Sequence, residues 1–158
     1  MNSLIIRKIK LGDHIGLKQN IYTDMDIEQI EKNVINNVKI MKNNGDWIYL
    51  VAELESEVVG TTYIKLNGSP VGQHIAELFS VVVSDKHRNK GICRALIDKA
   101  VEIAKKRNIE IITLSVREGT VADTVYQRIG FKEYGLLENG IKDGDVYFNE
   151  KYYCLKIK

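Results

Sequence analysis

The stretch HRNKGICRALIDKA, residues 87–100, lies between two apolar segments with different periods. Upstream, LFSVVVSD is an apolar run too short for most helices and indicates a strand. Downstream, apolar residues recur at helical spacing at Ile92, Ala95, Leu96, Ala100, Ile103 and Ala104. A basic, glycine-containing turn therefore joins a strand to a helix. Because the first amides of a helix lack intrahelical partners and the helix dipole favours negative charge, this junction predicts an anion site.

The elements around this turn predict a parallel β-α-β unit. The strand covers residues 74–84, the helix runs from Asn89 to about Lys106, and IEIITLSV (109–116) is a second, β-branched strand. Two strands joined through one helix should be parallel and connected by a right-handed crossover.

The remaining pattern completes a mixed α/β sheet that is largely antiparallel, with about seven strands and about four helices. Further strands are predicted at 3–9, 47–54, 58–66, 131–137 (FKEYGLL) and 145–158, with the residues ESE forming the turn of a hairpin. Further helices are predicted from a cap at Asp13 to Asn20, from Asp24 to Asn43 with a stop signal at Asn44-Gly45, and from Thr120 to Ile129 before Gly130.

Length and composition indicate one domain, residues 1–158. The net charge of +2 is too small to argue for nucleic acid or a membrane surface. Cys93 and Cys154 show no metal-ligand spacing, so no metal site is expected. No run approaches the roughly 20 apolar residues that span a bilayer, and nothing resembles a cleavable signal. A cytoplasmic location is the expectation.

The chemistry of the turn suits a large anion. Gly91 allows close approach to the backbone, and the amides of residues 89–94 face the same point. Arg88, Lys90 and Arg94 add charge-assisted contacts. The three spaced glycines of a dinucleotide fingerprint and the Gly-Lys-Ser/Thr ending of a P-loop are both missing.

Two separated motifs resemble those of the GNAT N-acetyltransferase superfamily. The segment Arg88-x-x-Gly91-x-Cys93 resembles its pyrophosphate motif, Gln/Arg-x-x-Gly-x-Gly/Ala. The segment TVADTVYQRIGF, 120–131, is similar to the second signature, Asn-x-x-Ala-x-x-x-Tyr-x-x-x-Gly-Phe. Cys93 and Gly119 are the departures, replacing a Gly or Ala and an Asn.

The resemblance implies an acetyl-CoA-dependent N-acetyltransferase with the GNAT fold, in which a primary amine attacks the thioester directly in a ternary complex. It also implies which residues contact acetyl-CoA: Val81, Val82 and Val83 for pantetheine, and Arg88, Asn89, Lys90, Gly91, Ile92, Cys93 and Arg94 for the pyrophosphate. Tyr126 occupies the position of the family's acid for the departing thiolate; the alternative is a tyrosine that packs the last helix on the sheet.

Glu77 is the candidate base, because some family members carry a glutamate eleven residues before the first motif residue. On an alternating strand it would share a face with Phe79, Val81 and Val83, partly buried, with a raised pKa. The alternative is an exposed glutamate at the margin of the sheet.

The alternative function is a non-catalytic acyl-CoA-binding or regulatory module of the same fold, which the departures at Cys93 and Gly119 favour and the retained Tyr126 and Glu77 oppose. A nucleic-acid-binding domain that uses the basic turn is disfavoured by the weak net charge and by the lack of aromatic residues among the basic ones, so neither a nucleic-acid nor a membrane partner is expected. The acceptor is either a small-molecule amine or a protein amine. The acidic run between Asp24 and Glu31 suits a helix N-terminus, or it attracts a cationic amine. The aromatic C-terminal strand is consistent with a homodimer interface.

Overall fold

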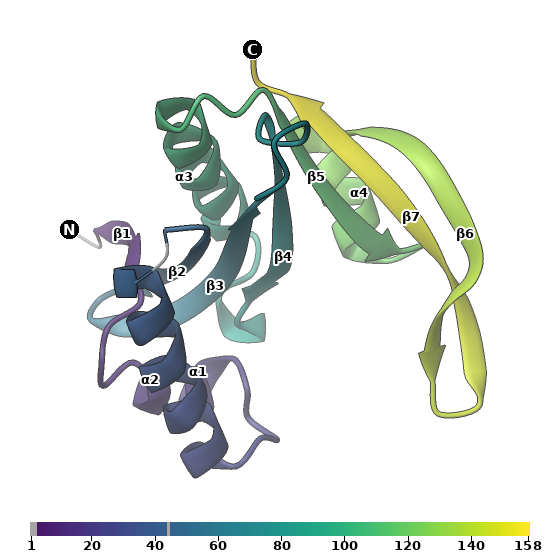
Figure 1. The fold of residues 1–158 in the computed structure, drawn as a ribbon. Helices are drawn as coiled ribbons and strands as arrows, with labels where there is room; N and C mark the ends of the chain where they lie inside the picture. The colour runs from purple at the N-terminus through teal and green to yellow at the C-terminus, as the bar shows by residue number, and fades with distance from the viewer. Residues whose placement is uncertain (1–2, 44) are drawn as a thin grey trace.

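The computed structural model describes residues 3–43 and 45–158, which form one seven-stranded sheet with helices on both faces (Figure 1). The strands are β1 (Leu4–Lys8), β2 (Trp47–Leu54), β3 (Glu57–Leu66), β4 (Ile75–Val83), β5 (Ile111–Arg117), β6 (Lys132–Asp143) and β7 (Val146–Lys156). The helices are α1 (His14–Asn20), α2 (Ile27–Asn43), α3 (Ile92–Lys106) and α4 (Val121–Ile129), with a 3₁₀ turn at Asp85–His87.

The strand order is β1-β2-β3-β4-β5-β7-β6, and among the described strands only the β4–β5 pair is parallel. The predicted mixed sheet with a central β-α-β unit is therefore confirmed. The predicted hairpin between β2 and β3 is present, and Glu55 and Ser56 both have the positive φ of a tight hairpin turn.

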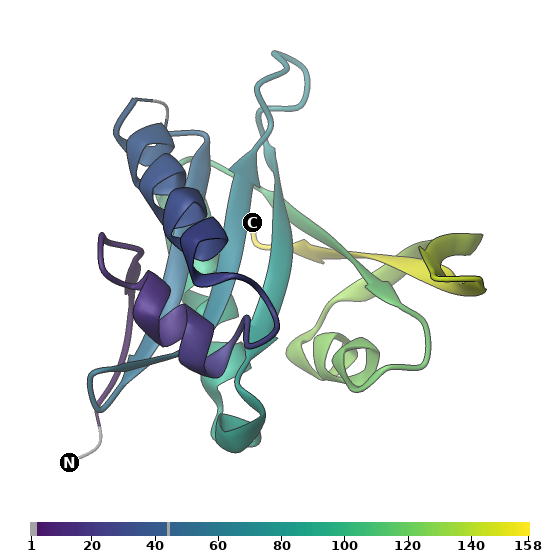
Figure 2. The ribbon, with the colours of Figure 1, turned by 90° about the horizontal axis from the view of Figure 1, so that it is seen from below.

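Alternation along β2 separates the two cores. Ile48, Leu50 and Ala52 belong to the main core with α3, whereas Tyr49 and Val51 belong to a second core with α1 and α2. Successive side chains of a strand point to opposite faces, so α3 and the α1–α2 pair cover opposite faces of the sheet (Figure 2). Tyr126 of α4 packs in the α3 core, which places α4 on the α3 face.

β4 and β5 form a fork. They pair only over residues 75–77 and 111–113, and Figure 1 shows them diverging beyond that point. The edge of β4 that faces β5 therefore has no strand partner at Val81, Val82 and Val83. The backbone groups on that edge are free to bind an extended ligand.

A β-bulge in β4 overturns one expectation. The β3–β4 register shifts between Thr61 and Tyr63, and Ser80 has φ +49°. Between these pairs β4 has one residue more than β3, and this reverses the alternation of its side chains between the two faces of the sheet. Val81 and Val83 therefore pack against the α3 core. Glu77 shares a face with Phe79, as expected, but the prediction that it also shares one with Val81 and Val83 is wrong.

Helix starts differ from the predictions for local reasons. α3 begins at Ile92 and not at Asn89, because Asn89 and Gly91 have φ of +60° and +75° and cannot continue a helix. α2 begins at Ile27 and not at Asp24, because the Asp26 carboxylate accepts hydrogen bonds from the amides of Glu28 and Gln29. Asn44, half of the predicted stop signal, lies outside the described residues.

Asp13 is the N-cap residue of α1, as predicted, but its side chain does not cap the helix. The side chain of Asp13 makes no hydrogen bond to α1; it accepts two from the Arg7 guanidinium, both at 2.8 Å, and one from the amide of Lys10. Arg7 also binds Glu53 at 2.6 Å. The aspartate therefore ties α1 to the edge of the sheet.

Candidate active site

The basic turn ends in an open backbone cradle. Gly91 precedes α3 in the left-handed conformation, and a Cβ built there meets no atom within 4 Å. The first intrahelical bond runs from the Ala95 amide to the Gly91 carbonyl, so the amides before Ala95 lack helical partners. This end of α3 combines free N–H groups, a positive dipole end and open space.

A cavity of about 740 Å³ opens beside this cradle. Its walls come from the last residues of β4, the turn before α3, the first turn of α3 and one face of α4. The predicted residues that line it are Val81, Val82, Val83, Arg88, Asn89, Gly91, Ile92, Cys93, Arg94 and Tyr126. Lys90 and Glu77 are not among its lining residues. Ten of the predicted residues, from the end of β4, the turn and start of α3, and α4, thus line one cavity.

The two arginines of the turn are held loosely. Arg88 pairs with Asp85 at 2.7 Å and Arg94 pairs with Asp98 at 2.9 Å, and all four side chains are exposed. Ion pairs of this kind contribute at most about 1 kcal/mol, so either guanidinium can turn to a phosphate at little cost.

Tyr126 projects from α4 into the cavity wall and is 6% exposed. Its ring packs edge-on against Phe131, with 5.9 Å between centroids. Burial, helped by the nearby Cys93 thiol, raises the pKa of Tyr126. In the described chain its hydroxyl has no hydrogen-bond partner, so it keeps a proton available to the cavity. Burial also raises the pKa of Cys93, which keeps that thiol protonated.

Glu77 lies at the fork, opposite Thr113 in the last β4–β5 pair. It faces away from α3 and α4, so the structure puts Glu77 and Tyr126 on opposite faces of the sheet. Burial raises the pKa of Glu77; Lys65 works against this rise and Glu150 adds to it. The raised pKa gives this carboxylate, next to the strand fork, a higher proton affinity than an ordinary exposed glutamate has.

The rest of the α4 wall was not predicted from the sequence. Val121, Val125 and Ile129 line the cavity and lie one turn apart on one side of the helix. Val121 is 77% exposed, which is a high exposed fraction for an apolar side chain. The four-residue spacing could have identified this face. His87 also lines the cavity, and its Nδ1 lies 3.3 Å from the Ser84 hydroxyl.

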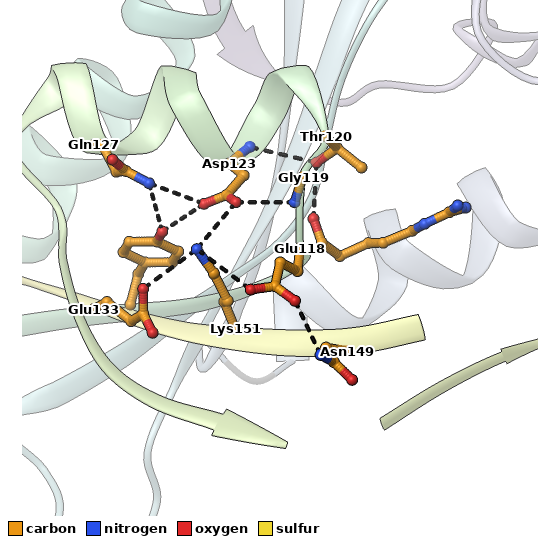
Figure 3. A network of polar contacts seen from close by, with 10 residues as sticks. Glu118, Gly119, Thr120, Asp123, Gln127, Glu133, Asn149 and Lys151 are labelled. Atoms are coloured by element: carbon orange, nitrogen blue, oxygen red, sulfur yellow. Dashed lines mark hydrogen bonds and ion pairs between the residues drawn. The ribbon is translucent and has the colours of Figure 1, made fainter. Parts of the chain in front are cut away.

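A buried polar network anchors the beginning of α4 (Figure 3). Asp123 accepts hydrogen bonds from the Gly119 amide at 3.0 Å, from the Gln127 side chain at 3.1 Å and from the Tyr153 hydroxyl, and Lys151 lies 3.4 Å away. Burial acts to raise the pKa of Asp123, but these donors outweigh it and lower the pKa to about 2. Since Tyr126 follows one turn later, this network fixes its position relative to β7.

Residues 3–43 and 45–158 contain no group of three or more His, Cys, Asp or Glu side chains arranged to hold a metal ion. None of their helices is both long and apolar enough to cross a membrane.

Comparisons with known proteins agree with this geometry. Residues 18–131 match the model of the acetyltransferase (GNAT) family. N-acetylaspartate synthetase from Xenopus tropicalis is 31% identical over 163 residues, which cover 96% of this chain and 54% of that protein. The chain thus spans about half the length of the curated relatives it matches.

Two solved structures share the fold. An N-acetyltransferase from Staphylococcus aureus Mu50 superposes with a TM-score of 0.82 at 22% identity, over 99% of each chain. A putative acetyltransferase from Salmonella typhimurium, solved with its cofactor acetyl-CoA, gives a TM-score of 0.79 at 16% identity, over 99% of this chain and 95% of that one. At these identities the likeness concerns the fold alone.

Proposed function

Because this chain belongs to the GNAT acetyltransferase family, we propose that it moves the acetyl group of acetyl-CoA to a primary amine by direct attack. The observation that carries the proposal is the 740 Å³ cavity, which joins the Gly91 cradle, the free edge of β4 and Tyr126. Each part suits a different portion of acetyl-CoA.

The cavity fits the donor in three places. The open space at Gly91 and the free amides of α3 suit the pyrophosphate, with Arg88 and Arg94 close by. The unpaired edge of β4 at Val81–Val83 suits the amides of pantetheine. The exposed apolar side chain of Val121 gives the ligand an apolar contact on the opposite wall.

Two protein side chains account for the proton transfers of this reaction. The amine nitrogen bonds to the acetyl carbon, the carbon–sulfur bond breaks, and the amine gives up one proton. Tyr126, held protonated by its burial, donates a proton to the departing sulfur. Glu77 accepts the amine proton from the other face of the sheet, and solvent returns it to Tyr126. No enzyme nucleophile is needed, and the protonated Cys93 thiol stays outside the reaction.

The test is release of the coenzyme A thiol from acetyl-CoA in the presence of a panel of primary amines. Release that depends on the amine, with acetylated product found by mass spectrometry, supports the proposal. Saturable acetyl-CoA binding with no release on any amine would instead favour the binding-only module, for which the loss of the family's asparagine at Gly119 is the relevant observation.

A further inference from the structure

A second cavity lies across the sheet from the first. Its volume is about 200 Å³, and it is enclosed by α1, α2 and the α2-side faces of β2, β3 and β4. Ser80 lines this second cavity, whereas its neighbour Val81 lines the 740 Å³ cavity. The β4 bulge therefore brings two separate cavities to adjacent residues of one strand.

The walls of the second cavity are apolar and aromatic. The rings of Tyr49 and Tyr63 stack with their centroids 3.9 Å apart, and the Tyr22 hydroxyl lies 3.5 Å from that of Tyr49. Ile30 and Val34, both almost fully buried, close the back. No charged side chain is among the described residues that line this space, so an ionised group has no partner inside it.

The volume suits one aromatic ring. An engineered apolar cavity of roughly 150 Å³ is known to bind benzene, so 200 Å³ accommodates one ring with some freedom. Offset stacking and edge contacts with tyrosine rings favour an aromatic occupant over an aliphatic one of the same size.

The open end gives the occupant a direction. The exposed residues that line the cavity are Met25, Asn33 and Ser80, so these three mark its open rim. At this rim Ser80 adjoins the end of β4 that lines the 740 Å³ cavity, and Asp24 and Asp26 flank Met25 in the chain. Negative charge at this rim attracts a protonated amine and leaves the interior apolar.

From this geometry we infer that the acceptor is a small arylalkylamine, whose ring occupies the second cavity and whose amine reaches the Ser80–Val81 step of β4. The inference rests on the proposed acetyl transfer, because it assigns the acceptor side of that reaction. The acceptor nitrogen forms the new bond to the acetyl carbon and loses one proton, and the thiol of coenzyme A leaves with one.

The experiment measures binding separately from turnover. Calorimetry with coenzyme A present compares phenethylamine, isopentylamine and ethylamine, which carry the same ammonium group. Phenethylamine should bind at least tenfold more tightly than ethylamine, with isopentylamine between them. Equal affinities for all three would overturn the inference, even if the protein acetylated each of them.

A rim variant assigns the effect to this cavity. Asn33 is exposed on α2 and lines the mouth, so Asn33→Trp should reduce the phenethylamine preference to less than threefold and leave coenzyme A affinity unchanged. Asn36→Trp, the same change at an exposed site outside the lining, should keep the preference. Met25→Trp provides a second block from the facing loop. A preference that survives both blocking variants would overturn the inference.

The binding result and the turnover result can fail independently. Selective amine binding that is lost in Asn33→Trp, with no thiol release, would sink the proposed acetyl transfer and keep the cavity assignment. Thiol release from acetyl-CoA without selective amine binding would keep the proposed acetyl transfer and sink the cavity assignment.

Discussion

Glu77 lies directly opposite Lys65 in the antiparallel ladder between β4 and β3. The ammonium group of Lys65 partly offsets the rise in the pKa of Glu77 that burial causes. Across β5, Glu150 acts in the opposite direction. The proton affinity of Glu77 is therefore set by groups on two other strands, and it can be changed without touching Glu77 itself.

Lys65→Met should raise the pKa of Glu77, because it removes the charge that favours the carboxylate. A base works when deprotonated, so the acid limb of kcat/KM against pH should move to higher pH. The matched control is Lys39→Met, which alters an exposed lysine on α2 and should leave the profile unchanged. If Glu77→Gln kept the acid limb of the wild-type protein, Glu77 would not be the base.

Tyr126→Phe should lower kcat by about 100-fold and leave the Kd for acetyl-CoA within about twofold, because the hydroxyl acts only as the sulfur departs. The ring keeps its contact with Phe131. Stopped-flow thiol release and calorimetry measure the two quantities. Tyr147→Phe, at an exposed position on the β6–β7 hairpin, is the control. An unchanged kcat would make Tyr126 a packing residue.

Asp123→Asn should lower the free energy of unfolding by about 2 kcal/mol at pH 7, because a buried carboxylate loses charge-assisted hydrogen bonds. The pKa of Asp123 is depressed to about 2 in the folded state, so its contribution is complete above the unfolded value near 4 and is lost as the pH falls toward 2. Urea unfolding at several pH values should show the two proteins converging in acid. Asp98→Asn, in an exposed pair, should cost about 0.5 kcal/mol or less. A constant difference across the acid range would contradict this account.

Arg7→Met should destabilise the protein by about 2 to 4 kcal/mol, because it leaves the 5% exposed Asp13 without its cation and removes the bridge to Glu53. Thermal and urea unfolding measure the loss. Lys8→Met, at the exposed neighbouring position of β1, should lie within about 0.5 kcal/mol of the wild type. Equal stability of the two variants would mean that Asp13 does not depend on Arg7.

Most of the residues that line the 740 Å³ cavity could be predicted to lie together because their determinants are local. The strand, the turn with Gly91 and the following helix are contiguous, and the Tyr126 signature is a single helix. The β2–β3 hairpin and the parallel β-α-β unit also follow from strand patterns and short connections. These features depend on residues within about one turn of each other, where the sequence carries a direct signal.

The features that escaped prediction depend on distant partners. Nothing in IAELFSVVV marks Ser80 as the bulged residue, because the shift arises from pairing with Thr61 and Tyr63. Asp13 stands where a cap would be, but Arg7 and the Lys10 amide compete for its carboxylate. The second cavity combines segments as far apart as Leu17 and Ser80, and no local pattern specifies such a space.

The central claim is that the cavity beside Gly91 binds acetyl-CoA, and calorimetric titration of the wild-type protein against Gly91→Glu tests it most directly. Gly144→Glu is the control, since Gly144 also has positive φ and open space but lies at a hairpin tip. The account predicts saturable binding between about 1 µM and 1 mM for the wild type and Gly144→Glu, and none for Gly91→Glu, where bulk and negative charge meet the pyrophosphate. Absent binding by the wild type, or unchanged affinity in Gly91→Glu, would contradict it.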